Sequence, residues 1–293
     1  MKKKIIISLS ILLGVIATAL TLCFTVFTVK TVDIDFRTST SLEWSTEELI
    51  ETAEIQNGQC VLFLSKKGYV ANLEKKNPYL EVINIETVFP SKLVIHCAER
   101  RELFAIQNES EIIYCDKDFK ILRRSYGTFD SSKDNPILLK NLTIKGEYEI
   151  GDFLDIEEKG MKRFLSSMVE NSKTYPQTLG FCKEIILEKV DNTLSNQKEV
   201  NMTMRTFSDR EIKILNIDLY LTRKLNYVFQ GLPELYDLLV TNGEYTVEEV
   251  NRCSLVVGNQ ITAVGNNIVQ TDELYIHIYL DGEVIEGVKK NKN

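Results

Sequence analysis

The N-terminal part of the chain contains a long run of apolar positions with lysines on both sides. Lysines at positions 2–4 precede an uncharged, mostly apolar segment over residues 5–29, and Lys30 follows it. At a rise of about 1.5 Å per residue, a helix of this length crosses a hydrocarbon core of roughly 30 Å. A cleaved signal peptide has an apolar stretch of only about 7–15 residues and then a small-residue cleavage site. The pattern therefore predicts an uncleaved transmembrane helix over residues 5–29.

The lysines at the start of the chain also predict the orientation of this helix. Because positively charged flanks stay in the cytoplasm, residues 1–4 are expected to form a cytoplasmic tail. The residues that follow the helix are then expected to lie outside. The chain is thus predicted to be a single-pass protein of the cytoplasmic membrane with extracytoplasmic C-terminal domains.

Small and hydroxyl residues recur along the predicted span at intervals of four and three. At helical spacing these positions fall on one side, where small side chains allow close contact with a second membrane helix. The alternative is that the threonine hydroxyls bond back to carbonyl groups of their own helix. The candidate helix interface consists of Gly14, Thr18, Thr21, Thr25 and Thr28.

After the span, the hydrophobic pattern predicts a compact module of residues 30–100. Alternation over 32–36 indicates a strand, and a capping box at 45–48 opens a short helix. A second helix over about 66–76 stops before a proline. Alternating apolar positions on either side of Phe89-Pro90 predict a strand hairpin. The first strand of this hairpin is expected to turn Ile83, Ile85 and Phe89 to one face. The predicted order is β-α-α-β-β.

Residues 96–101, His-Cys-Ala-Glu-Arg-Arg, form the densest cluster of potentially reactive side chains. On a regular strand His96 and Cys97 point to opposite faces, so they cannot form a nucleophile–base pair. Cys97 is predicted on the buried face, and Glu99, Arg100 and Arg101 as a charged exit from the strand. The cluster is therefore not predicted to be catalytic.

The module resembles the POTRA domain of the FtsQ/DivIB cell-division proteins. The segments that match are Pro78-Tyr79-Leu80, Phe89-Pro90, Leu93-Val94-Ile95, Glu99-Arg100-Arg101 and Ala105. The sequence departs from the family pattern at Leu103, where a proline is usual. Residues 112–122 are similar to the hairpin that follows in the family, with Phe119 in the place of a glycine.

The resemblance implies a non-catalytic scaffold of the bacterial cell-division complex. Such a protein would join small bitopic coiled-coil proteins, FtsB/DivIC-like and FtsL-like, outside the membrane at the division septum. It would help to regulate septal peptidoglycan synthesis, and no cofactor is expected.

The pattern over residues 101–288 predicts a second extracytoplasmic domain with helices and a largely antiparallel sheet. The predicted fold class of the chain is therefore α+β. A helix over 157–169 places Met161, Phe164, Leu165 and Met168 on one face. Strands are predicted over 184–190 and 212–221. A second helical stripe consists of Leu225, Val228, Phe229 and Leu232, resumed by Leu235, Leu238 and Leu239. Residues 255–270 receive no assignment, and residues 289–293 are expected to be a basic tail.

The alternating segment 274–280 followed by Asp281-Gly282 predicts a strand that leads into a hairpin. We expect this strand near one edge of the sheet, where a partner chain could pair with its backbone. Its polar face carries Tyr275, His277 and Tyr279, which are the candidate partner-binding residues. The alternative is that these rings cover a helix inside the domain.

The composition and the absence of known catalytic motifs limit which classes of function are expected. The chain is 44% hydrophobic and 26% charged with net charge −7, which fits a folded protein and gives no reason to expect nucleic-acid binding. Phosphate-loop, nucleophile-elbow and zinc-helix motifs are absent from the sequence, so neither a catalytic nor a metal site is predicted. The remaining alternatives are a membrane-anchored hydrolase that uses carboxylates, another POTRA-containing envelope protein, and an exported sensor.

The cysteines of the predicted extracytoplasmic part are irregularly spaced and form no C-x-x-C motif. They are Cys60, Cys97, Cys115, Cys182 and Cys253. An odd number at irregular spacing favours buried, unpaired thiols over a disulfide framework.

Overall fold

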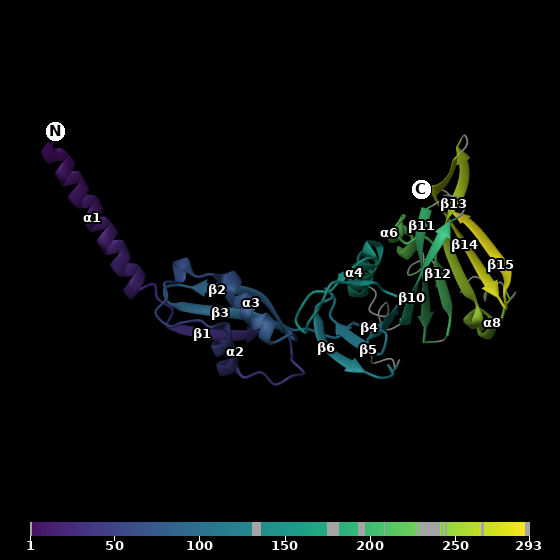
Figure 1. Ribbon diagram of the computed structural model, residues 1–293, viewed down its shortest axis with the longest axis horizontal. Coiled ribbons are helices and arrows are strands. Elements are labelled where there is room, and N and C mark those ends of the chain that lie inside the picture. The colour runs from purple at the N-terminus through teal and green to yellow at the C-terminus, as the bar shows by residue number, and fades with distance from the viewer. Residues whose placement is uncertain are drawn as a thin grey trace. The chain divides into compact units, whose positions relative to one another are not determined.

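The computed structural model describes residues 2–130, 136–174, 182–192, 197–207, 209–226, 228, 241, 243, 245–264 and 267–290 (Figure 1). The chain divides into two compact units, Met1–Arg101 and Glu102–Asn293. Its first element is the helix α1 (Lys2–Thr25). Within the described ranges, no helix combines the length and apolarity that crossing a membrane requires. The span predicted over residues 5–29 is not confirmed.

The first unit contains the predicted β-α-α-β-β order. Its elements after α1 are β1 (Thr31–Phe36), α2 (Thr46–Ala53), the short 3-10 helix η1 (Val61–Phe63), α3 (Lys66–Lys76), β2 (Leu80–Val88) and β3 (Lys92–Glu99). The strands form a sheet in the order β1-β3-β2, with β1 parallel and β2 antiparallel to β3. Ser45 caps α2, because its hydroxyl oxygen accepts a hydrogen bond from the Glu48 N–H (3.3 Å).

The buried face of β3 agrees with the sequence pattern, whereas that of β2 does not. Leu93, Ile95 and Cys97 are fully buried against the helices. Burial, with Glu74 and Asp35 as smaller contributors, raises the pKa of the Cys97 thiol to about 12.

Of the three residues predicted on the inward face of the first hairpin strand, only Ile85 lies in the core, while Ile83 is 47% and Phe89 61% exposed. The predicted face was wrong for Ile83 because a β-bulge between Val82 and Asn84 shifts the alternation there. It was wrong for Phe89 because β2 ends at Val88 and Phe89 lies in the turn that follows.

Thr28 does not belong to the N-terminal helix. α1 ends at Thr25, and Thr28 forms an isolated antiparallel bridge with Cys60. The Thr28 side chain is buried, and Val29 packs in the core of the first unit. The prediction of a helix through residue 29 was therefore wrong, because the residues after Thr25 pair with the loop before η1.

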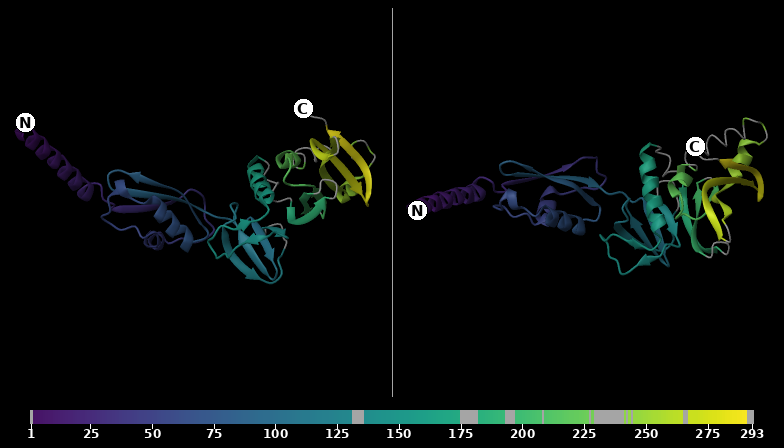
Figure 2. Two further views of the ribbon diagram at one scale, coloured as in Figure 1. Left: turned by 45° about the horizontal axis from the view of Figure 1, so that its top comes forward. Right: turned by 90° about the horizontal axis from the view of Figure 1, so that it is seen from above.

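Within the described residues, the second unit is built on a ten-stranded sheet, which Figure 2 shows from two further sides. In spatial order its strands are β15 (Glu283–Lys290), β14 (Asn267–Leu280), β13 (Ser254–Val264), β12 (Glu211–Ile214), β11 (Gln197–Thr206), β10 (Cys182–Asn192), β7 (Ile137–Lys140), β4 (Phe104–Asn108), β5 (Glu111–Cys115) and β6 (Ile121–Tyr126). The pairs β12/β13, β10/β7 and β4/β7 are parallel and the others antiparallel. The predicted largely antiparallel sheet is confirmed.

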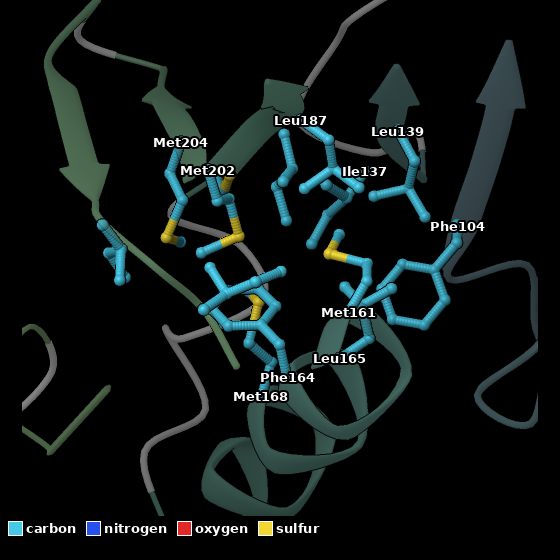
Figure 3. Packing of buried hydrophobic residues seen from close by; sticks show 14 of the residues in the cluster. Phe104, Ile137, Leu139, Met161, Phe164, Leu165, Met168, Leu187, Met202 and Met204 are labelled. Atoms are coloured by element: carbon cyan, nitrogen blue, oxygen red, sulfur yellow. The ribbon is translucent and has the colours of Figure 1, made fainter. Parts of the chain in front are cut away.

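The predicted amphipathic helix is α4 (Lys159–Thr174), and it supplies the helical side of the main core. Its apolar face contacts side chains from the central strands, among them Leu187, Met202 and Met204 (Figure 3). The four predicted inward residues, Met161, Phe164, Leu165 and Met168, are all fully buried.

The other elements that the structure describes in the second unit are short. They are α6 (Leu221–Asn226), α8 (Val247–Arg252) and the small ladder of β8 (Ile144–Lys145) with β9 (Asp155–Ile156). Of the second predicted helical stripe, Leu225 and Val228 are buried. Phe229, Leu232, Leu235, Leu238 and Leu239 lie outside the described residues. The strand predicted over 212–221 ends at Ile214, because the chain turns at Asn216 with a positive φ of 45°.

Phe119 occupies the position where the sequence pattern of the hairpin has a glycine, and its backbone is left-handed with φ 64°. The side chain of Asp116 supports this turn by accepting hydrogen bonds from the N–H groups of Asp118 and Lys120 (both 2.9 Å). The Phe119 ring is fully buried and stacks on Phe104 with centroids 5.5 Å apart. Burial of the ring thus compensates for an unfavourable backbone conformation.

Candidate interaction surface

The strand that carries Tyr275, His277 and Tyr279 lies inside the sheet and not at its edge. β14 pairs with β13 on one side and with β15 on the other. The Asp281-Gly282 turn, with φ 50° and 90°, leads into β15, so β15 is the edge strand. The strand lies near one edge, as predicted, but both of its sides are paired, so the expectation that a partner pairs with its backbone was wrong. The hairpin signal itself could have identified the following strand as the edge.

Tyr275, His277 and Tyr279 form a row of rings on one face of β14. The centroids of Tyr275 and His277 are 4.8 Å apart, and those of His277 and Tyr279 are 6.3 Å apart. The Tyr275 ring covers Gly258 of β13, where an added Cβ would lie 2.6 Å from the ring. Burial, and to a lesser degree Tyr279, raises the pKa of Tyr275. Tyr275 therefore packs on its own sheet, while the role of the row in partner binding stays a prediction.

The opposite edge of the sheet, at β6, is covered and charged. The Ile121 N–H donates to the Asp152 carbonyl oxygen (2.8 Å), so a following loop segment shields the strand. Arg123 forms a bidentate ion pair with Glu102 (2.6 and 3.0 Å), and its guanidinium carbon lies 3.4 Å from the centroid of the Tyr114 ring. Charged side chains and covering loops are common protections of edge strands.

The edge at β15 differs from β6. In the part of the chain that the structure describes, no strand pairs with the side of β15 that faces away from β14. Val284 on this strand is 53% exposed. Of the two sheet edges, β15 is the one that offers backbone groups to a second chain.

Side chains of the cluster at residues 96–101 contact neighbouring segments of the first unit. His96 points away from Cys97, and its ring nitrogens lie 2.9 Å from an Asp35 oxygen and 3.2 Å from a Glu86 oxygen. Both nitrogens thus face carboxylates of the neighbouring strands β1 and β2. The prediction that His96 and Cys97 occupy opposite faces is confirmed.

Glu99, the last residue of β3, binds the loop between β1 and α2. Glu99 accepts hydrogen bonds from the Ser41 and Leu42 N–H groups (2.7 and 3.1 Å). Burial opposes its ionisation, but these bonds and that of the Ser41 hydroxyl outweigh burial and lower the pKa of Glu99.

Arg100 is buried, in contrast to the predicted surface charge. Its Nη2 lies 3.1 Å from a Glu74 oxygen, and its Nε donates to the Leu80 carbonyl oxygen (3.2 Å). A second Glu74 oxygen accepts from the Val82 N–H (2.9 Å). The pair therefore joins α3 to both strands of the hairpin, an arrangement that the local pattern of charges does not encode.

The threonine hydroxyl groups of α1 bond back to carbonyl groups of their own helix, which is the alternative to a helix interface given above. The hydroxyl groups of Thr18 and Thr21 donate to the carbonyl oxygens of Gly14 and Ala17 (both 2.9 Å), and Thr25 donates to the Thr21 carbonyl oxygen (2.6 Å). A partner-helix interface on this side stays a prediction for Gly14, Thr18, Thr21 and Thr25, and Thr28 is no longer part of it.

The chain was compared with protein families and with known proteins. Residues 27–100 match the FtsQ-type POTRA domain family. The chain is 25% identical over 225 residues to the cell division protein DivIB of Clostridium tetani (strain Massachusetts / E88), covering 74% of this chain and 75% of the relative. The chain thus contains an FtsQ-type POTRA domain and is similar over most of its length to a DivIB cell division protein.

The FtsQ-type POTRA domain begins at Phe27, two residues after the end of α1. Among solved structures, the chain matches the major extracytoplasmic domain of the trans isomer of DivIB from Geobacillus stearothermophilus, with 12% identity and a TM-score of 0.23. That match covers 45% of this chain and 96% of the other.

The five cysteines of the POTRA domain and the second unit are unpaired and buried. This agrees with the interpretation of the spacing. Among the described residues, no group of three histidine, cysteine, aspartate or glutamate side chains is arranged to hold a metal ion.

Proposed function

We propose that this chain is a non-catalytic scaffold of the bacterial cell-division complex, anchored in the cytoplasmic membrane by α1. The FtsQ-type POTRA domain and the similarity to the cell division protein DivIB of Clostridium tetani support a role in cell division. The lysines at positions 2–4 support a cytoplasmic N-terminus, with the POTRA domain and the second unit outside.

The open edge at β15 is the observation that carries the scaffold role. A strand from a partner would add to β15 through main-chain hydrogen bonds, while the row Tyr275, His277 and Tyr279 on the adjacent strand would supply selectivity. The partners would be small bitopic coiled-coil division proteins, FtsB/DivIC-like and FtsL-like. Through them the chain would help to regulate septal peptidoglycan synthesis.

Site-specific photocrosslinking in growing cells tests the docking site, because the two sheet edges offer matched positions. A photoreactive amino acid would be introduced at Val284 on β15 or at Tyr126 on β6, which are 53% and 74% exposed. We expect a crosslink to a single-span coiled-coil protein, identified by mass spectrometry, at position 284 and none at position 126. Crosslinks only at position 126, or equal yields at both, would assign the partner to another surface.

A second experiment separates the ring row from the fold. Tyr279→Ala should weaken capture of the partner while the melting temperature stays within a few degrees, since Tyr275 alone covers Gly258. The double variant Tyr275→Ala with Tyr279→Ala should abolish capture. A large loss of stability in the single variant would place Tyr279 among the residues that hold the sheet together.

The cellular role is tested by a fluorescent fusion of the full chain in dividing cells. A band at midcell that coincides with new septum supports the cell-division role. A uniform envelope signal through the whole cycle would contradict it.

A further inference from the structure

Three segments meet at the end of the POTRA domain that adjoins α1. The Val61 N–H donates to the Phe27 carbonyl oxygen (2.8 Å), and the Val29 N–H donates to the Gln59 carbonyl oxygen (2.9 Å). On the other side, the Lys30 N–H donates to the carbonyl oxygen of Ser91 in the β2–β3 turn (2.8 Å). The chain just after α1, the η1 region and the β2–β3 turn thus form one surface.

This surface exposes large apolar side chains. Phe63 is 80% exposed and Phe89 is 61% exposed, and the Phe89 ring meets the Phe27 ring edge to face with centroids 6.2 Å apart. We call this set of exposed residues the basal collar; it consists of Val26, Leu62, Phe63, Val88 and Phe89. Neighbouring apolar side chains exposed together mark an interaction site on a folded domain.

Lysines predominate around the basal collar. The segments 26–32, 56–70 and 87–93 contain Lys30, Lys66, Lys67 and Lys92 and no aspartate or glutamate, although the whole chain has a net charge of −7. Lys92 forms an ion pair with Asp33 of β1, and the Lys66 ammonium donates to the Ile85 carbonyl oxygen (2.8 Å). The side chains of Lys30 and Lys67 are exposed. An apolar centre with a lysine rim is the composition of surfaces that bind at the boundary of an anionic bilayer.

The basal collar is also continuous with α1. The N–H groups of Val26 and Phe27 both donate to the Leu22 carbonyl oxygen (2.9 and 3.0 Å), so these residues extend directly from the last turn of the helix. If α1 occupies a bilayer, the collar lies within a few residues of its outer boundary. At this depth the apolar faces of interfacial segments insert phenylalanine and leucine, and lysine side chains reach the headgroups.

We propose that the basal collar docks on the outer surface of the bilayer that holds α1, with its rings at the headgroup boundary and its lysines at anionic phospholipid headgroups. The inference rests on the proposed membrane anchor. It adds a second contact with lipid, through the POTRA domain itself, which would limit how freely that domain tilts and rotates about α1.

Quenching of tryptophan fluorescence by brominated phospholipids tests this docking in the full chain. The only tryptophan is Trp44. It stacks on Phe36, which ends β1 five residues after Thr31 and away from the collar. In a Trp44→Phe background, Phe63→Trp places the reporter in the collar. Ile83→Trp is the matched control, because Ile83 is also exposed (47%) but lies on β2, five residues before Val88.

The two variants would be incorporated into vesicles of phosphatidylcholine and phosphatidylglycerol with brominated acyl chains. We expect the tryptophan at position 63 to emit at shorter wavelength and to be quenched at least about twofold more than the one at position 83. The wild-type Trp44 should be quenched no more than the control. Exchanging phosphatidylglycerol for phosphatidylcholine should reduce the quenching at position 63.

The outcomes distinguish the docking from the anchor. If the chain floats with the vesicles and resists carbonate extraction, but position 63 is quenched no more than position 83, the docking proposal is overturned and the anchor stands. If the chain does not float with the vesicles, the anchor is overturned and the docking with it. Equal quenching at position 63 in both lipid mixtures would overturn the role of the lysine rim.

Discussion

Replacing Lys224 by methionine should remove a pH dependence from the stability of the second unit. The Lys224 side chain is fully buried, and its Nζ donates to the carbonyl oxygens of Leu215 and Asn216 (2.7 and 2.8 Å). Burial lowers the pKa of Lys224 to about 7, although the charges of Glu199 and Asp218 raise it. The ammonium form is thus disfavoured in the folded state.

The sign of the effect follows from proton counts. In the unfolded chain Lys224 has its ordinary pKa of 10.5, so between pH 7 and 10.5 the unfolded chain holds a proton that the folded chain has released. Stability therefore rises with pH in this window, by at most about 1.4 kcal/mol per pH unit. From about pH 6 to about pH 8.5 the expected gain is about 2 kcal/mol. Below pH 7 both states are largely protonated and the contribution levels off.

The assay is urea unfolding of the full chain in a non-ionic detergent, followed by circular dichroism at several pH values. Tryptophan emission reports the first unit, since Trp44 is the only tryptophan. Lys213→Met is the control, because Lys213 lies on the neighbouring strand β12 with a half-exposed side chain that pairs with Glu188 (3.3 Å). The difference in unfolding free energy between wild type and Lys224→Met should grow with pH, whereas the difference for Lys213→Met should stay constant.

Two results would refute the reasoning. If Lys224→Met follows the wild type in parallel across the pH range, the buried amine does not change its charge there. If the wild type instead loses stability relative to the variant as pH rises, the two carbonyl groups favour the ammonium form more than burial opposes it.

Three further substitutions test contacts in both units. Arg100→Met should cost about 3–5 kcal/mol because Glu74 stays buried without its cation, and adding Glu74→Met should recover much of this loss; additive losses in urea unfolding would contradict the pairing. Gly258→Ala should destabilise the sheet by about 1–3 kcal/mol by displacing the Tyr275 ring. The cost should shrink in a Tyr275→Ala background, and an unchanged cost would contradict the steric cause. Phe119→Gly should cost about 2–4 kcal/mol, since the lost ring outweighs the relieved backbone; a more stable variant in thermal unfolding would contradict this.

Features that depend on a few neighbouring residues were predictable from the sequence. The cap at Ser45, the burial of Cys97, the apolar face of α4 and the turn at Asp281-Gly282 all follow from local spacing. Helical and strand periodicities place side chains on faces whatever the rest of the chain does. The family resemblance also rested on such local segments, and the match over residues 27–100 covers them.

The order of strands was decided only by the tertiary structure. Alternation gives Tyr275 and its neighbours a face, but it does not state how many strands lie beyond them. β14 became an inner strand because β15 pairs along it after the turn, which moved the open edge, and with it the proposed docking site, to the last strand. Strand neighbours depend on contacts between distant segments, and local periodicity carries no information about them.

The roles of individual polar residues likewise depend on contacts with residues far away in the sequence. Thr28 left the predicted helix because it pairs with Cys60, and Arg100 became a buried cation because Glu74 lies on α3 beside it. Lys224 resembles any helical lysine in the sequence, yet in the fold two backbone carbonyl groups hold its amine inside the core. A sequence states which groups carry charge, but only the packed chain determines which of them lose water and therefore need a partner.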